Sequence, residues 1–212
     1  MTRVRKDPLE RRQELMDISL ELFCSQGYEQ TMVQDICKKA GVAKGTFFYY
    51  FPTKEDVLRA IFVRWTDVFV GRYAQQAAGK DGAEKLLLLL ELFGADNPMD
   101  EMIDRLFAES RGDLADLLWK HCRARGFEPL LRDILQQGQR EGRMHLTDIE
   151  AAMDFFWAIL DATWPEERQD ELDDAQLAAR QKTAGGLIEA LFGMAPGSLA
   201  LFYAQDAQGE TE

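Results

Sequence analysis

The sequence has few of the residues from which disulfide frameworks and metal sites are built. Its three cysteines, Cys24, Cys37 and Cys122, are an odd number and lack CxxC spacing. Its two histidines, His121 and His145, lie neither in an HExxH pattern nor beside a plausible nucleophile. We therefore expect no metal centre and no catalytic residues. The cysteines are expected to be buried free thiols.

Long apolar runs and nucleotide-binding loops are also missing. The run Leu86–Leu90 is five residues long, whereas a membrane span needs roughly 20 apolar residues. The chain opens with MTRVRKDPLERR, which has no apolar signal-peptide core. Neither a GxGxxG loop nor a GKS or GKT loop occurs. We expect a cytoplasmic protein that contacts no membrane, needs no cofactor and is not an enzyme.

Strand-like alternation and internal repeats are absent too, and helical patterns fill the chain. Apolar residues recur every three or four positions in segments separated by glycine, proline and polar residues. Capping residues at Asp7 and Thr53, and a capping box over Thr147–Glu150, are expected to begin three helices. The expected helices lie between Asp7 and Gly27, over residues 32–40, 43–50, 53–78, 83–93, 98–107 and 113–123, between Gly126 and Gly142, and over residues 148–164 and 175–192. The sequence thus predicts an all-α fold.

Residues 31–54, TMVQDICKKAGVAKGTFFYYFPTK, have the pattern of two short helices joined by a tight turn. Thr31 begins a Thr-x-x-Gln capping box, which is expected to start the first helix. Gly41 has the backbone freedom that a helix C-terminus or a turn requires, so it is expected to end this helix. In the second helix Phe47, and after it Phe51, are expected to face the core. This arrangement is a helix-turn-helix.

A set of residues with defined spacing extends this unit over residues 10–60. It comprises Phe23, Gly27, Tyr28, Thr31, Ile36, Ala40 to Val42, Lys44 to Phe47, Tyr50 to Glu55 and Leu58. The set resembles the N-terminal DNA-binding domain of the TetR family of transcriptional regulators. It departs from the family at Ala43, where Ser or Thr is frequent, and at Phe48, where Tyr is common. The resemblance implies a dimeric regulator, usually a repressor, that binds a palindromic operator and responds to a small ligand.

The resemblance also implies which residues contact double-stranded DNA. They are Thr31, Lys44, Gly45, Thr46, Tyr49, Tyr50 and Lys54. Those from Lys44 to Tyr49 would lie in the major groove or at its edge, whereas Thr31 and Lys54, at helix N-termini, would hold phosphates. Arg3, Arg5 and Lys6 form either a disordered tail or an arm that reaches DNA.

The charge of the chain is divided unevenly, although its net value is −12. Residues 1–64 carry 11 basic and 9 acidic side chains, whereas residues 65–212 carry 14 and 28. Such a division is expected if DNA binding is confined to the N-terminal part and the acidic remainder faces away from phosphates. An acidic surface that only maintains solubility is the alternative.

The chain beyond residue 65 is rich in large apolar side chains, most of which are expected in the core. Taken together with the resemblance, they imply a pocket for a small apolar or aromatic effector. The candidate ligand-binding residues are Trp65, Phe69, Met102, Phe107, Trp119, Phe127 and Phe156. The last two helices are rich in alanine and glycine, and the resemblance implies that they pair with a second copy in a homodimer.

We expect a helix-turn-helix DNA-binding domain over residues 1–52 and a larger helical domain for ligand binding and dimerisation over residues 53–212. The alternative is an all-helical enzyme or small-molecule binding protein in which the helix-turn-helix is only architectural. Salt-dependent binding to DNA would separate the two hypotheses.

Overall fold

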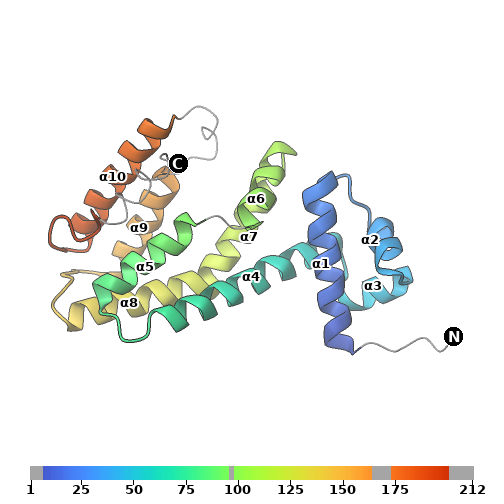
Figure 1. Cartoon of the computed structure of the whole chain (residues 1–212), viewed down its shortest axis with the longest axis horizontal. Coiled ribbons are helices and arrows are strands. Elements are labelled where there is room, and N and C mark those ends of the chain that lie inside the picture. The colour runs from blue at the N-terminus through green and yellow to red at the C-terminus, as the bar shows by residue number, and fades with distance from the viewer. Residues whose placement is uncertain (1–6, 96–97, 164–172, 201–212) are drawn as a thin grey trace, which may run out of the picture. The chain divides into compact units, whose positions relative to one another are not determined.

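The computed structural model describes residues 7–95, 98–163 and 173–200, and within these ranges the chain is helical with no strand (Figure 1). The helices are α1 (Pro8–Gln26), α2 (Val33–Ala40), α3 (Lys44–Tyr50), α4 (Lys54–Gln76), α5 (Gly82–Gly94), α6 (Pro98–Ala108), α7 (Gly112–Cys122), the π-helical turn η1 (Arg123–Phe127), α8 (Glu128–Arg140), α9 (Ile149–Thr163) and α10 (Asp174–Leu191). The predicted all-α fold is confirmed. The basic residues Arg3, Arg5 and Lys6 lie outside the described ranges.

Two of the predicted helix caps are present. The Asp7 carboxylate accepts the Leu9 N–H at 2.8 Å at the start of α1. At the start of α4, the Thr53 hydroxyl accepts the Asp56 N–H at 3.1 Å while the Asp56 carboxylate accepts the Thr53 N–H at 3.0 Å. Each cap satisfies backbone donors that a helix N-terminus leaves without an intrahelical partner.

Two other predicted caps are wrong. The Thr31 hydroxyl is buried and donates to the Gly27 carbonyl at 2.6 Å, so the Asp35 carboxylate closes the first turn of α2 by accepting the Met32 N–H at 3.0 Å. At α9 the neighbouring Asp148 caps in place of Thr147, because its carboxylate accepts the N–H groups of residues 150 and 151. At α2 the Gly27 carbonyl binds the hydroxyl that was predicted to cap, and at α9 a neighbouring carboxylate binds the N–H groups that Thr147 was predicted to cap.

The predicted break at Gly126 is also wrong. Residues 123–127 form a π-helical turn that carries the chain from α7 directly into α8. Pro129, near the N-terminus of α8, has no N–H to donate to the preceding turn. Phe127, the last residue of the π-helical turn, is fully buried.

The chain divides into two compact units. Unit 1 contains residues 1–69 and 96–124, and unit 2 contains residues 70–95 and 125–212, so α4 contributes to both. The predicted division into a DNA-binding domain and a ligand-binding domain at residue 52 concerns function and stays a prediction. No helix within the described ranges is long and apolar enough to cross a membrane.

The core of unit 1 joins the first helices to α4, α6 and α7. Its fully or almost fully buried apolar side chains include Leu15, Phe23, Ile36, Phe47, Phe51, Val57, Leu58, Phe62, Met102, Leu106 and Leu118. The ring centroids of Phe23 and Tyr28 lie 5.1 Å apart in an edge-to-face arrangement. In this core α2 packs against the longer α1, and α3 packs against α2.

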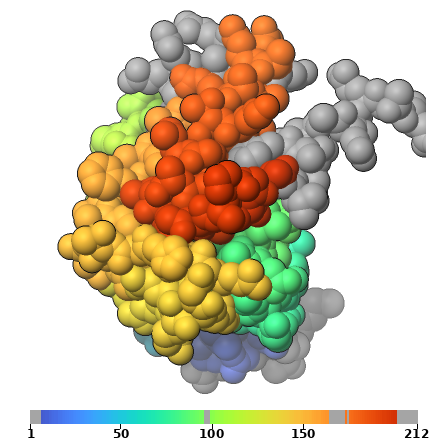
Figure 2. Space-filling model, turned by 90° about the vertical axis from the view of Figure 1, so that its left-hand side faces the viewer, coloured from blue at the N-terminus to red at the C-terminus, as the bar shows by residue number. Residues whose placement is uncertain are grey.

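Unit 2 is built from two pairs of packed helices, α5 with α8 and α9 with α10. A Cβ atom on Gly82 would lie 2.5 Å from the backbone of Gly138, so only glycine permits the close approach of α5 to α8. Phe156 of α9 stacks on Phe192 just after α10, with ring centroids 5.7 Å apart. Figure 2 shows the surface formed by α8, α9 and α10.

Candidate nucleic-acid interface

The turn between α2 and α3 has the hydrogen bonds of a Schellman motif. Gly41 adopts a left-handed backbone with φ 63°. Its N–H donates to the Lys38 carbonyl at 3.3 Å, and the Val42 N–H donates to the Cys37 carbonyl at 3.0 Å. The predicted helix-turn-helix is therefore present, with a short α3 following the turn.

α3 has one buried side and one exposed side. Phe47 is fully buried and Phe51, which follows the helix, is 2% exposed, so both predicted core positions are confirmed. Tyr49, in contrast, is 80% exposed. The remaining members of the predicted contact set on this helix are Lys44 and Gly45, which are exposed, and Thr46 and Tyr50, which are partly exposed.

The exposed side of α3 can approach another surface closely. A Cβ atom added to Gly45 would meet no protein atom within 4 Å. Ala43 at the N-cap makes no side-chain hydrogen bond, as expected from its lack of a hydroxyl. The exposed aromatic, hydroxyl and ammonium groups of this helix are the types that bind bases and phosphates.

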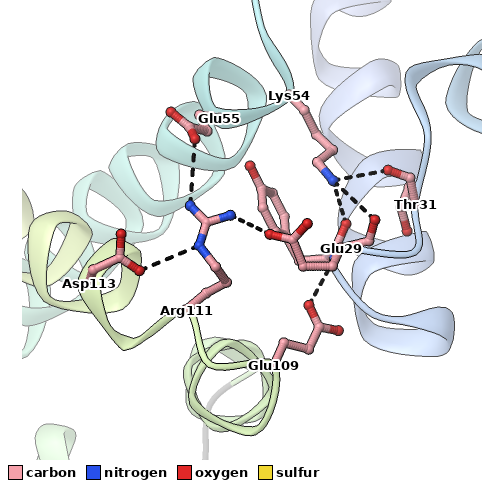
Figure 3. Close-up of polar contacts among 8 residues, drawn as sticks. Glu29, Thr31, Lys54, Glu55, Glu109, Arg111 and Asp113 are labelled. Carbon is pink, nitrogen blue, oxygen red and sulfur yellow. Dashed lines mark hydrogen bonds and ion pairs between the residues drawn. The ribbon is translucent and has the colours of Figure 1, made fainter.

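Thr31 and Lys54 have internal partners. The Thr31 hydroxyl is buried, as described above, and accepts from the Gln26 amide at 3.2 Å. The Lys54 ammonium donates to the Tyr28 carbonyl at 2.7 Å and the Thr31 carbonyl at 3.2 Å (Figure 3). It also lies 4.1 Å from the centre of the Tyr28 ring. Both residues thus hold the α1–α2 turn, residues 27–32, and their phosphate contacts stay a prediction.

Three polar residues that the sequence did not single out meet at this same turn (Figure 3). The Glu109 carboxylate accepts the Glu29 N–H at 2.8 Å. The Arg111 guanidinium forms an ion pair with the Glu29 carboxylate and donates a hydrogen bond to it. This hydrogen bond raises the pKa of Arg111. No local pattern could indicate these contacts, because about 80 residues separate the partners.

The candidate ligand-binding residues are distributed over both units. Five of them, Trp65, Phe69, Met102, Phe107 and Trp119, belong to unit 1, and Phe127 and Phe156 belong to unit 2. Met102, Phe127 and Phe156 are fully buried, whereas Trp65, Phe107 and Trp119 are partly exposed. Their contact with a ligand stays a prediction.

The three cysteines and two histidines were considered for metal or thiol chemistry, and they differ in burial. Cys37 and Cys122 are buried, whereas Cys24 is only partly buried. Burial raises the pKa of the Cys24 and Cys37 thiols, which favours the protonated form at neutral pH. His121 and His145 are exposed. Within the described part of the chain no group of three or more His, Cys, Asp or Glu side chains could hold a metal ion.

Comparison with known proteins adds an independent finding. The sequence profile described as "Bacterial regulatory proteins, tetR family" matches residues 15–61. The fatty acid metabolism regulator protein of Bacillus subtilis is 28% identical over 156 residues, which cover 71% of this chain and 79% of that protein. The transcriptional repressor KstR2 of Mycolicibacterium smegmatis is 27% identical over 165 residues, which cover 76% and 80% of the two chains.

A solved structure agrees with these sequence similarities. The fatty acid degradation regulator FadR of Bacillus halodurans superimposes with a TM-score of 0.63 at 26% identity. The match covers 87% of this chain and 96% of that one. The similarity therefore extends well beyond the helix-turn-helix.

Proposed function

Because this chain belongs to the TetR family of transcriptional regulators, we propose that it is a cytoplasmic repressor that binds a palindromic DNA operator as a homodimer. The exposed side of α3, above all Tyr49 at 80% exposure, is the observation that carries this proposal. A folded helix-turn-helix that leaves its second helix accessible is suited to the major groove. Lys44, Gly45, Thr46 and Tyr50 complete the proposed contact surface.

Replacing Lys44 or Tyr49 by alanine is expected to weaken binding to DNA without unfolding the protein. Both side chains are exposed, so their loss leaves the core intact. Loss of a base contact costs about 1 to 3 kcal/mol, or roughly 5- to 150-fold in affinity. Binding would be measured by fluorescence anisotropy on the duplex that the wild-type protein selects from a random-sequence library.

Lys120→Ala is the charge-matched control, because Lys120 is exposed on α7 rather than on α3. It should bind the selected duplex like the wild-type protein. Wild-type affinity in both Lys44→Ala and Tyr49→Ala would contradict the proposed interface. If the wild-type protein selects no duplex at all, the alternative function, a small-molecule binding protein or enzyme with an architectural helix-turn-helix, is favoured instead.

The homodimer is proposed from the exposed sides of α9 and α10. Phe155 of α9 is 62% exposed, and Leu187 of α10 is 53% exposed. Around Phe155 the exposed residues Ala151, Ala158 and Ala162 lie at helical spacing, which gives a surface with little side-chain bulk. Two such surfaces related by a two-fold axis would form an isologous interface, which matches the symmetry of a palindromic operator.

The effector is proposed to be a small apolar or aromatic molecule that lowers DNA affinity. Two similar proteins are named for fatty acid metabolism and degradation, so fatty acids and their acyl thioesters are the first probes to test. α4 is the proposed coupling element, since its first part belongs to unit 1 and its last part to unit 2. An effector acts only through different affinities for the DNA-binding and the released conformations.

The test uses a fatty acid or acyl thioester that raises the melting temperature of the protein. The affinity of the protein for this ligand should be lower when operator DNA is present than when it is absent. A coupling of about 1 to 3 kcal/mol corresponds to a roughly 5- to 150-fold difference, and the ligand must weaken DNA binding by the same factor. Quenching of Trp65 and Trp119 fluorescence would report ligand binding. Equal affinities with and without DNA would contradict the proposed switch.

A further inference from the structure

The corner between α6 and α7, residues 109–111, has a tightly specified backbone. Ser110 has φ 60°, a left-handed conformation that favours glycine. Its N–H donates to the Phe107 carbonyl at 2.9 Å, and the Arg111 N–H donates to the Leu106 carbonyl at 2.7 Å. These are the two hydrogen bonds of a Schellman motif, here formed with serine at the left-handed position. The corner therefore holds Glu109 and Arg111 in defined places on either side of Ser110.

Glu109 lies directly against the backbone of the α1–α2 turn. Besides accepting the Glu29 N–H, its carboxylate occupies the space beside Gly27, where a Cβ atom would lie 2.0 Å from Oε1. Gly27 has φ 94°, which an L side chain rarely adopts. The absence of a side chain at this position allows the acidic residue to approach the turn.

Arg111 reaches three carboxylates from three different elements (Figure 3). It pairs with Glu29 of the α1–α2 turn, with Glu55 in the first turn of α4 at 3.6 Å, and with Asp113 in the first turn of α7 at 3.4 Å. Arg111 is about one quarter exposed. A planar guanidinium can serve several carboxylates at once, which an ammonium does less well.

Glu29 and Glu55 lie on opposite sides of the helix-turn-helix in the chain. α2 and α3 form one segment, Val33–Tyr50, which the chain enters through the α1–α2 turn and leaves at the start of α4. Glu29 lies just before this segment, and Glu55 lies just after it. Arg111 thus makes an ion pair at both ends of the segment that carries the proposed DNA-binding surface.

We propose that Arg111 is a positioning residue for DNA recognition: by bridging Glu29 and Glu55 it sets the orientation of α2 and α3 that binds DNA. This inference rests on the proposed function. Arg111 acts through the turn and the start of α4, and makes no contact with DNA itself. Glu109 supports it by holding the turn from the same corner.

Arg111→Gln tests the proposal, because glutamine keeps a polar side chain but cannot pair with two carboxylates. The folded variant is expected to bind the duplex selected by the wild-type protein roughly 2- to 30-fold more weakly, the range seen for residues that influence a site without contacting its ligand. The salt dependence of binding should keep its wild-type slope, because no phosphate contact is lost. A direct phosphate contact would instead reduce the slope by about 1.

Arg105→Gln is the matched control. Arg105 lies on α6 and pairs with Glu101 of the same helix at 3.4 Å, so the variant removes the same charge without touching either end of the α2–α3 segment. It should bind DNA like the wild-type protein. Glu55→Gln, which removes only one of the bridged carboxylates, should weaken DNA binding in the same direction as Arg111→Gln, and the two effects should be less than additive in the double variant.

The outcomes separate the inference from the proposed function. Wild-type affinity in folded Arg111→Gln, a flattened salt slope, or equal losses in Arg105→Gln would overturn the positioning role while leaving DNA binding established. Should Arg111→Gln not fold, Glu55→Gln, whose side chain is 52% exposed, provides the same test. Failure of the wild-type protein to select any duplex would overturn both proposals.

Discussion

Gly27→Ala is expected to destabilise the protein by about 3 kcal/mol. Gly27 has φ 94° and ψ 155°, a region that is populated almost exclusively by glycine and that costs other residues roughly 1 to 3 kcal/mol. The added methyl group would also displace the Glu109 carboxylate, which then loses its hydrogen bond with the Glu29 N–H. The free energy of unfolding, measured by urea titration, would report the loss.

Gly41→Ala is the matched control, because an added Cβ atom there causes backbone strain without a steric conflict. Gly41 also has a positive φ, 63°, but a Cβ atom there would meet nothing within 4 Å. Alanine should cost only about 1 to 2 kcal/mol at this position, the usual penalty of the left-handed region. A loss in Gly41→Ala as large as that in Gly27→Ala would contradict the special role of the α1–α2 turn.

The double variant Gly27→Ala/Glu109→Ala distinguishes backbone strain from the steric conflict. The Glu109 carboxylate is the end of a flexible side chain that can move aside, whereas the backbone at residue 27 cannot. Strain should therefore dominate, and removing the Glu109 side chain should restore little stability. Recovery of wild-type stability in the double variant would show that the conflict dominates instead.

Phe155→Asp is expected to convert the proposed dimer into monomers. An aspartate at this position would place one carboxylate from each protomer in the proposed α9–α10 interface. An uncompensated buried charge costs about 3 to 5 kcal/mol. A loss of 4 kcal/mol would raise the dimer dissociation constant roughly 1,000-fold. Sedimentation velocity over a range of protein concentrations would measure the change.

Leu117→Asp supplies the comparison for this experiment. Leu117 is 56% exposed, close to the 62% of Phe155, but it lies on α7 of unit 1. It should leave the dimer intact. A monomeric wild-type protein, an unchanged dimer in Phe155→Asp, or dissociation caused by Leu117→Asp would each rule out the α9–α10 interface.

The helix-turn-helix was predictable because its determinants are close together in the chain. Thr53 and Asp56 form their reciprocal cap across three residues, and Phe47 with Phe51 follows the period that places both on one side of α3. The turn at Gly41 depends on one left-handed residue and two local hydrogen bonds. Such features follow from backbone geometry and short-range spacing alone.

The errors arose where one group had several partners within reach. Thr31 matched the capping pattern, but folding placed its hydroxyl beside the Gly27 carbonyl, and Asp35 capped α2 instead. The residue pattern likewise did not show that the Lys54 ammonium reaches carbonyls of the α1–α2 turn, more than 20 residues earlier. Its predicted phosphate contact stays a prediction. A pattern of residue types does not state which of two available partners is nearer.

The sequence alone determined the helical fold, the helix-turn-helix and the resemblance to the TetR family, because periodicity, caps and motif spacing are local properties of the chain. Tertiary structure decided which distant residues contact the helix-turn-helix. Arg111 and Glu29 are 82 residues apart, and their ion pair exists only because α6, α7 and the α1–α2 turn pack in one unit. Contacts between side chains distant in sequence depend on packing, which no single stretch of residues encodes.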